Sequence, residues 1–203
     1  MEVSQAAPLG LRERKKLQTR EALSWAVIRL SVERGWGNVT IEDAAVAANV
    51  SERTFRNYFS SKAEAVAARH LDRMLLIAAG LRDRPPAEPL WDAITGAVLG
   101  QFTGGQPRGR AWTDAIQLML TEPDVAGEIL KANAAAQLDL AAAVAGRTGT
   151  DPDRDLYPAL VAAAITAAIT TVMDHWLHAD PAVAIEALMS EAFGLLQAGL
   201  PNP

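Results

Sequence analysis

The stretch that decides the fold is TIEDAAVAANVSERTFRNYFSSK, residues 40–62, which contains two short helical patterns separated by a tight corner. Thr40 is a favourable N-cap for the first helix, and Asp43 stands three residues later, at the spacing of a capping box. Asn49 tolerates the left-handed backbone conformation that a tight corner needs. Ser51 can cap the second helix. These residues predict two short helices joined at a sharp angle.

The second short helix has one apolar face and one polar face. Phe55 and Phe59 lie four residues apart, so they share a face that we expect to be buried. Arg53, Arg56 and Asn57 share the opposite face, where their side chains suit the reading of guanine and adenine edges. A polar face that only contacts water is the alternative, but it does not account for the caps, the corner and the apolar back together. The pattern is typical of a helix-turn-helix, whose second helix enters the DNA major groove.

The composition of the 203 residues favours an all-α fold, because 50% are hydrophobic, with alanine prominent, and β-branched runs are scarce. The sequence has no cysteine, which excludes disulfides, thiol catalysis and cysteine-ligated zinc and is typical of a reducing compartment. Residues 1–10 lack the basic start and apolar core of a signal peptide. We therefore expect a disordered tail at residues 1–10 and a cytoplasmic protein.

Charge is distributed unevenly along the chain. Residues 10–62 contain ten Lys and Arg against six Asp and Glu, so this segment carries +4 and the rest carries −9 of a net charge of −5. A basic head on an acidic body orients a protein toward a polyanion through one face. The run RERKK, residues 12–16, is either a solvated basic segment or a contact to a phosphate or minor groove, and both interpretations stay open.

Apolar periodicity and turn signals predict about nine helices. In the first helix, Leu23, Val27 and Leu30 are spaced to face inward. Ser61 and Glu64 have the spacing of a second capping box, which opens a long fourth helix. The expected helices are 11–34, a two-turn helix capped by residue 40, a third capped by residue 51, 61–82, 90–102, 110–120, 124–145, 156–177 and 182–200.

One segment requires a test for membrane insertion. Between Asp155 and Asp174 lie eighteen uncharged residues, close to the minimum length of a membrane span. Alanine and threonine dominate this segment, and acidic residues stand at its ends, where basic or aromatic anchors are usual. We therefore expect a buried helix of a soluble protein and no contact with a membrane.

The sequence offers no recognisable catalytic constellation. His175 and His178 stand beside Asp174 at a spacing that can hold a metal, but no third ligand is in view, and the dipole at a helix C-terminus favours histidine in any case. The glycine-rich residues 100–110 lack the GK[ST] ending of a phosphate-binding loop. We therefore expect no enzymatic activity, no metal and no cofactor.

The block TREALSWAVIRLSVERGWGNVTIEDAAVAANVSERTFRNYFSSKAEAV, residues 19–66, closely resembles the DNA-binding domain of the TetR family of bacterial transcriptional regulators. The matching features are ERG at the end of the first helix, Val-Thr before the second, VSxRTFxxYF as recognition helix, and SK with an acidic residue opening the fourth. The resemblance implies a three-helix DNA-binding domain, expected at residues 11–62. It also implies a helical ligand-binding and dimerisation domain, expected at residues 63–203.

Two positions depart from the family pattern. Asn49 replaces the usual glycine, and Ser31 replaces a large apolar residue, whose place in the core we expect Trp25 or Trp36 to fill. The resemblance assigns phosphate contacts to Thr40, Tyr58 and Lys62. It assigns base contacts to the outward side of the recognition helix, which consists of Glu52, Arg53, Thr54, Arg56 and Asn57. The expected DNA-contacting residues are Thr40, Ser51, Glu52, Arg53, Thr54, Arg56, Asn57, Tyr58 and Lys62.

The last two expected helices are apolar over too much of their circumference for one-sided packing to bury. In the family, the corresponding helices pack against their copies in a partner subunit, so we expect a homodimer with a four-helix interface. Its recognition helices would meet half-sites about 34 to 36 Å apart. The expected interface residues are Val161, Ile165, Ile169, Val172, Leu188, Met189, Phe193 and Leu196.

Several aromatic and methionine side chains lie on helices that, in the family layout, border a central ligand cavity. Such residues either form an ordinary core or line a pocket for a small molecule. The expected pocket residues are Trp91, Phe102, Trp112, Met119, Met173 and Trp176.

We therefore expect a homodimeric TetR-like regulator, acting as a repressor that a small apolar ligand releases from a near-palindromic operator. RERKKLQTREAL and RTFRNYF further resemble the actinobacterial subgroup that includes the repressor of the mycofactocin system, and this likeness implies an acyl-coenzyme A as ligand. A helical ligand-binding or enzymatic protein, whose head is only an interaction module, is the alternative. Activation in place of repression, and regulation without a ligand, also stay open.

Overall fold

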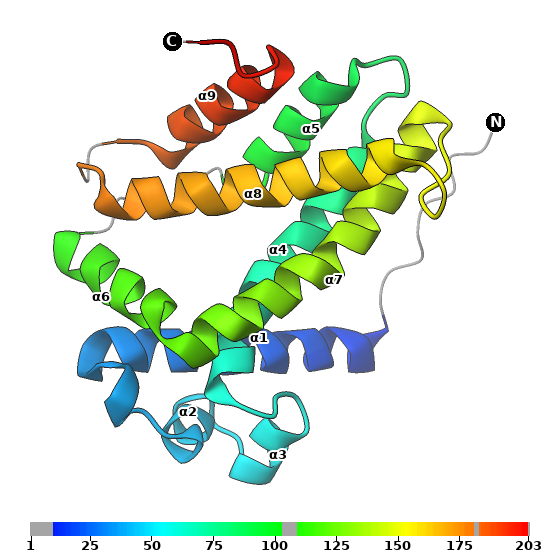
Figure 1. Ribbon diagram of the computed structural model, residues 1–203. Coiled ribbons are helices and arrows are strands. Elements are labelled where there is room, and N and C mark those ends of the chain that lie inside the picture. Colours follow the sequence, from blue (N-terminus) through cyan, green and yellow to red (C-terminus); the bar gives the residue numbers. More distant parts are fainter. Residues whose placement is uncertain (1–9, 103–108, 181–182, 203) are drawn as a thin grey trace. The chain divides into compact units, whose positions relative to one another are not determined.

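The computed structural model describes residues 10–102, 109–180 and 183–202 (Figure 1). Within these ranges the chain forms nine α-helices, one short 3₁₀ helix and no strand, which confirms the all-α prediction. The expected tail at residues 1–10 lies outside the described residues except for Gly10, and the glycine-rich connection lies partly outside them. The elements are α1 (Leu11–Arg34), η1 (Trp36–Asn38), α2 (Ile41–Ala47), α3 (Glu52–Arg56), α4 (Lys62–Asp83), α5 (Leu90–Leu99), α6 (Arg110–Thr121), α7 (Pro123–Thr148), α8 (Leu156–His178) and α9 (Ile185–Gln197).

The chain divides into two compact units, one ending at Val66 and the other beginning at Ala67. The division falls inside α4, so this single helix contributes to both units. The domain limits expected at residues 62 and 63 stay a prediction.

In the N-terminal unit, α1 and α3 bury their apolar faces in one core. Leu23, Val27 and Leu30 of α1 are buried, as their spacing predicted. Phe55 and Phe59 are buried as well, and their rings meet edge to face with centroids 5.7 Å apart. The two phenylalanines therefore fix which side of α3 faces inward.

Small residues and one tryptophan complete this core. Ala44 and Ala45 of α2 are buried, and their short side chains allow α2 to approach α1 and α3 closely. Trp36 is buried, whereas Trp25 is 36% exposed. Of the two candidates to replace the apolar residue missing at position 31, Trp36 is therefore the core residue.

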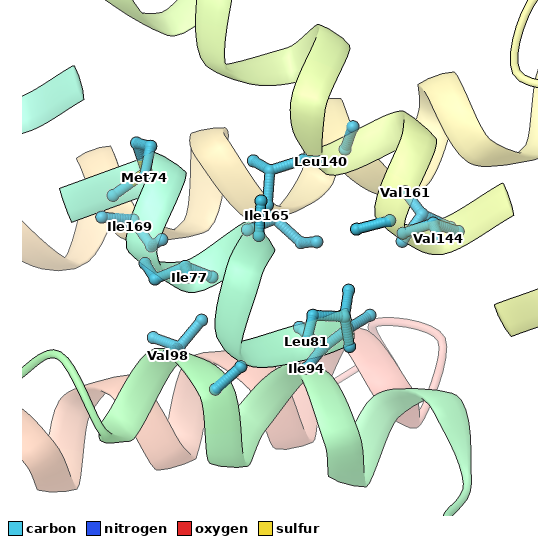
Figure 2. Packing of buried hydrophobic residues seen from close by; sticks show 14 of the residues in the cluster. Met74, Ile77, Leu81, Ile94, Val98, Leu140, Val144, Val161, Ile165 and Ile169 are labelled. Carbon is cyan, nitrogen blue, oxygen red and sulfur yellow. The ribbon is translucent and has the colours of Figure 1, made fainter. Parts of the chain in front are cut away.

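In the C-terminal unit, α8 contacts α6, α7 and α9, and α9 also contacts α5 (Figure 1). Met74, Ile77 and Leu81 of α4 meet side chains of α5, α7 and α8 in one apolar cluster (Figure 2). By length and composition alone α8 could cross a membrane, with a mean hydropathy of 1.8 over its most apolar window. Ile165 and Ile169 of α8 are nevertheless fully buried in this cluster, as expected of a core helix.

The connection between α4 and α5 is held by Arg147 of α7. Its guanidinium donates hydrogen bonds to the carbonyl oxygens of Leu81 (3.5 Å), Arg84 (3.0 Å), Pro85 (3.0 Å) and Glu88 (2.8 Å). The side chains of Arg84 and Glu88 also form an ion pair within the connection. Arg147 thus donates both to a carbonyl oxygen in the last turn of α4 and to carbonyl oxygens of the connection that follows it.

The structure corrects the residues expected at the dimer interface. Six of the eight are buried in the core of their own protomer, and the other two pack partly against it. A side chain buried in its own core cannot contact a second copy. Periodicity shows that a helix is apolar on two sides but does not show which side faces the protomer's core. The buried six are Val161, Ile165, Ile169, Val172, Met189 and Phe193. Leu188 and Leu196 are partly buried, and their role in the interface stays a prediction.

Candidate nucleic-acid interface

The first helix of the motif, α2, begins with the predicted capping box. Thr40 Oγ1 accepts a hydrogen bond from the backbone N–H of Asp43 (3.1 Å), and the Asp43 carboxylate accepts one from the backbone N–H of Thr40 (2.9 Å). The Thr40 hydroxyl also donates to this carboxylate, at 2.6 Å. These hydrogen bonds, together with the positive charge of Arg34, lower the pKa of Asp43. The start of α2 is therefore fixed by local contacts.

The corner between α2 and α3 has the predicted geometry. Asn49 adopts a left-handed conformation with φ of +56°, and the backbone N–H of Val50 donates to the carbonyl oxygen of Ala45 at 2.9 Å. Ser51 Oγ accepts a hydrogen bond from the backbone N–H of Thr54 at 3.1 Å. This cap starts α3 directly after the corner.

The polar face of α3 points to solvent, as predicted. Arg53, Arg56 and Asn57 are exposed, while Phe55 on the opposite side is fully buried. Glu52, at the start of the helix, is exposed as well. The helix therefore presents guanidinium, amide and carboxylate groups on one accessible surface.

One interaction on this surface was not anticipated. Glu52 Oε1 accepts hydrogen bonds from both Nε (2.9 Å) and Nη2 (2.6 Å) of Arg56. The two residues are four apart on α3, and this spacing is a signal for an ion pair that could have been read from the sequence. Two residues expected to face bases thus also contact each other.

Lys62 lies at the first turn of α4, where it holds the segment that precedes α2. Its ammonium donates to the carbonyl oxygens of Trp36 (2.5 Å) and Val39 (3.1 Å) and lies 4.0 Å from the centroid of the Trp36 ring. The phosphate contact expected of Lys62 stays a prediction, beside this observed structural role.

The other residues expected to contact DNA lie around the same motif. Thr40 and Ser51 are exposed at the N-termini of α2 and α3, where both hydroxyls serve as caps. Thr54 is partly buried, and its Oγ1 lies 2.9 Å from Ser51 Oγ. Tyr58 is partly buried next to Phe59, with ring centroids 6.4 Å apart. Their contacts to phosphate or bases stay predictions.

The start of α4 differs slightly from its predicted capping box. Ser61 Oγ accepts the backbone N–H of Glu64 at 3.0 Å, as expected. The Glu64 carboxylate, however, accepts the backbone N–H of Ser60 (2.7 Å) and the Ser60 hydroxyl (2.6 Å). The reciprocal hydrogen bond of the box therefore reaches one residue further back.

The first turns of α1 are accessible. All residues from Leu11 to Gln18 are exposed, including the basic run at 12–16. A surface hollow of about 360 Å³ lies between α1 and α2. Arg34 and Asp43, which form an ion pair at 3.5 Å, both line this hollow. Both interpretations of the basic run at 12–16, a solvated segment or a contact to DNA, stay predictions.

The residues expected to line a ligand pocket occupy the C-terminal unit. Phe102 and Met119 are buried, and the other four are partly buried. Trp91 and Met173 pack against the apolar cluster of this unit, and Trp176 Nε1 donates to the carbonyl oxygen of Val183 at 3.0 Å. Their role in a pocket stays a prediction.

The histidine pair considered for a metal has other partners. His178 Nδ1 lies 2.7 Å from the carbonyl oxygen of Asp174, and His178 Nε2 lies 2.5 Å from the side-chain nitrogen of Gln117. Across the described parts of the chain, no three His, Cys, Asp or Glu side chains are grouped so that they could hold a metal ion.

Comparison with known proteins assigns the two units to one family. Residues 26–68 match the family model for bacterial regulatory proteins of the tetR family, and residues 88–201 match the model for the MftR C-terminal domain. The transcriptional regulator TcmR of Streptomyces glaucescens is 32% identical over 180 residues, which cover 84% of this chain and 79% of TcmR. The chain belongs to the TetR family of transcriptional regulators.

A second relative and one solved structure are also similar to this chain. The protein MftR of Mycobacterium tuberculosis, named for transcriptional regulation of mycofactocin biosynthesis, is 26% identical over 188 residues, which cover 92% of this chain and 93% of MftR. The fold is shared with FadR of Bacillus subtilis, solved in complex with stearoyl-CoA, at a TM-score of 0.59 and 16% identity, with 89% of this chain and 98% of FadR covered. The resemblance read from the sequence is thus confirmed. The curated relatives are named as transcriptional regulators.

Proposed function

We propose that this TetR-family regulator is a repressor that binds a near-palindromic operator as a homodimer and releases it when a small molecule binds the C-terminal unit. One observation carries the DNA-binding part of the proposal. The exposed side of α3 presents Arg53, Arg56 and Asn57, while Phe55 and Phe59 bury its opposite side. These outward groups can hydrogen-bond base edges in a major groove.

The proposed DNA contacts divide into two kinds. Base reading is assigned to the exposed side chains of α3, chiefly Arg53, Arg56 and Asn57. Phosphate contacts that set the register are assigned to Thr40, Tyr58 and Lys62, and to Ser51 at the start of α3. A DNA-binding regulator of this kind acts where the chromosome is, so we place it in the cytoplasm.

The dimer is assigned to the exposed side of α8, which replaces the six buried residues expected from the sequence. Leu156 is 71% exposed, Tyr157 47% and Leu160 56%. Residues at spacings of three, four and seven continue this side along the helix, and they are small, so a second helix can approach closely. We define the outer face of α8 as Leu156, Tyr157, Leu160, Ala163, Ala164, Ala167 and Thr171.

A second copy is the occupant that best fits this face. The outer face of α8 is apolar and uncharged over about four turns, and isolated soluble proteins rarely leave such a stripe in water. Packing against its own copy buries the same residues from both protomers in a two-fold interface. Dimerisation places two α3 helices so that they can meet two half-sites of one operator.

The ligand is proposed to bind among the helices of the C-terminal unit. FadR of Bacillus subtilis, which shares this fold, was solved with stearoyl-CoA bound, and one family model that matches this chain is the MftR C-terminal domain. A molecule with an apolar part, for which an acyl-coenzyme A is the specific candidate, suits the aromatic and methionine side chains expected to line the pocket. Because α4 contributes to both units, a ligand that displaces α4 can change DNA binding.

Selection from randomised duplexes, followed by anisotropy titration of the selected sequence, tests the proposal. We expect wild type to select a near-palindromic sequence. Arg56→Ala should weaken binding to that sequence about ten-fold or more and binding to unrelated DNA only a few-fold. Arg29→Ala is the matched control, because Arg29 is also an exposed arginine of the N-terminal unit paired four residues away, with Glu33 (3.1 Å). If wild type selects no sequence, the proposed function is wrong.

A further inference from the structure

Arg73 of α4 lies against an aromatic ring and not against a carboxylate. Its guanidinium carbon lies 4.6 Å from the centroid of the Phe102 ring, and Phe102 is itself only 7% exposed. By contrast, Arg82 is paired with Asp139 at 3.3 Å, and Arg154 lies 3.7 Å from a carboxylate oxygen of Asp151. Among residues 10–102, 109–180 and 183–202, Arg73 forms no ion pair. An aromatic ring attracts a cation but does not neutralise its charge.

The surroundings of Arg73 make its positive charge costly. Burial lowers the pKa of the guanidinium, and the positive charge of Arg69, one turn earlier on α4, lowers it further. Asp72 is the adjacent residue, but neighbouring residues on a helix point in different directions, and both Arg69 and Asp72 have interactions of their own. The charge of Arg73 is therefore held in a poorly solvated place without a carboxylate beside it.

His70, three residues before Arg73 on α4, adds no negative charge. His70 Nε2 lies 2.6 Å from Asn133 Oδ1 of α7. Burial of the His70 ring lowers its pKa, so the ring is neutral at pH 7. The groups shown to interact with the Arg73 guanidinium are thus the Phe102 ring and the positive charge of Arg69.

We propose that Arg73, on the face of Phe102, binds a negatively charged group of the ligand, and that the ligand is an anionic amphiphile with a carboxylate or phosphate attached to an apolar body. A desolvated cation recovers the interactions it has lost when an anion binds it, and a guanidinium does so with two parallel hydrogen bonds. The apolar body has neighbours nearby, since Phe102 belongs to the apolar cluster of this unit and Ile77, one turn after Arg73 on α4, is fully buried in it. This inference rests on the proposed ligand-responsive function and specifies its ligand.

Titration of the full chain with three probes of equal chain length tests this assignment, with tryptophan fluorescence as the signal. Dodecanoate carries a carboxylate, dodecanoyl-coenzyme A carries phosphates, and 1-dodecanol carries no charge. We expect wild type to bind at least one anionic probe about ten-fold more tightly than dodecanol. Arg73→Met should remove most of that preference and change dodecanol binding by less than about two-fold. The anionic probe that wild type prefers shows whether Arg73 binds a carboxylate or a phosphate.

Arg82→Met is the matched control, because Arg82 lies on the same helix with its guanidinium exposed and paired with Asp139. It should leave all three affinities unchanged. Thermal unfolding without ligand provides a second readout: Arg73→Met should be at least as stable as wild type, since it removes a desolvated charge. A marked loss of stability, equal losses for charged and uncharged probes, or an unchanged preference for the anion would each overturn the assignment.

A release experiment separates this inference from the proposed function. If wild type holds its selected operator and none of the three probes releases it, the proposed response to such ligands is wrong. If dodecanol releases the operator as well as the anionic probes do, the response stands and only the role of Arg73 is overturned.

Discussion

Glu52 binds the Arg56 guanidinium through a single carboxylate oxygen, Oε1, which lies 2.9 Å from Nε and 2.6 Å from Nη2. This geometry uses the Nε–H and one N–H of Nη2, and it leaves Nη1 and the outer N–H of Nη2 available. An arginine needs two such terminal N–H groups for a bidentate contact with guanine. Glu52 therefore restricts the rotamers of Arg56 without occupying the edge that would meet a base.

Replacement of Glu52 by alanine should reduce base discrimination at the position that Arg56 contacts. Two duplexes that differ only in carrying adenine or guanine at that position give the ratio of Kd values for adenine over guanine. We expect this ratio to fall roughly two- to five-fold, because the released arginine samples more rotamers. The substitution also changes the net charge of the protein, but this affects the affinity for both duplexes equally and cancels in the ratio. Glu33→Ala, which removes the similar exposed pair with Arg29, is the control and should leave the ratio unchanged. If Glu52→Ala has the same effect when Arg56 is already alanine, Glu52 acts independently of Arg56.

The capping box of α2 predicts an acid-sensitive contribution to stability. The hydrogen bonds from Thr40 lower the pKa of Asp43 in the folded protein below its usual value of 3.8. The folded state thus binds the proton less readily than the unfolded state. The stabilisation is present above the unfolded pKa and is lost as pH falls through the folded pKa.

This contribution can be isolated by comparing wild type with Asp43→Asn in denaturant titrations between pH 7 and pH 2. The difference in free energy of unfolding should shrink below about pH 4, where the carboxylate becomes protonated. Thr40→Val should reduce the same pH dependence by removing the hydroxyl of the box. A difference between wild type and Asp43→Asn that stays constant down to pH 2 would show that this carboxylate does not contribute through its charge.

The outer face of α8 predicts a variant that separates dimerisation from folding. Leu160→Glu should convert the dimer to a folded monomer, because it places a charge within the proposed interface. Leu138→Glu is the matched control, since Leu138 of α7 is 75% exposed and lies outside that face. Sedimentation gives the mass, and circular dichroism shows whether each variant is folded. A Leu160→Glu variant that remains dimeric would exclude this face as the interface.

The buried side of α8 should respond differently. Ile169 is fully buried in the core of its own protomer, so Ile169→Ala should lower the free energy of unfolding by about 2–5 kcal/mol. Chemical denaturation at several protein concentrations checks that the loss does not arise from dissociation alone. A loss below about 0.5 kcal/mol would contradict the placement of this side chain in the core.

Arg147→Met should destabilise the C-terminal unit by about 2–4 kcal/mol, because several carbonyl oxygens of the α4–α5 connection lose their hydrogen-bond donor. Arg154→Met is the control: this arginine is 86% exposed and should change stability by less than about 0.5 kcal/mol. Urea denaturation followed by tryptophan fluorescence gives both values. Equal effects of the two substitutions would show that the carbonyl contacts of Arg147 add little.

The sequence by itself determined the helix-turn-helix and the family. The caps of α2 and α3 and the apolar side of α3 depend on residues no more than four positions apart, such as Thr40 with Asp43 and Phe55 with Phe59. Helix geometry fixes the relative positions of such neighbours whatever the rest of the chain does. The same reasoning could have found the pair of Glu52 with Arg56. The orientation of α3 was therefore predictable, while its contacts to DNA remain to be measured.

Only the tertiary structure decided which apolar side of α8 is buried and where the long-range hydrogen bonds lie. Lys62 donates to Trp36, 26 residues away, and Arg147 to Leu81, 66 residues away. No spacing in the sequence encodes such pairs, because they depend on how several helices pack together. Ile165 and Leu160 are equally apolar in the sequence, yet one is fully buried and the other is 56% exposed. The position of each helix against its neighbours makes that choice, and it follows from the packing of the whole core.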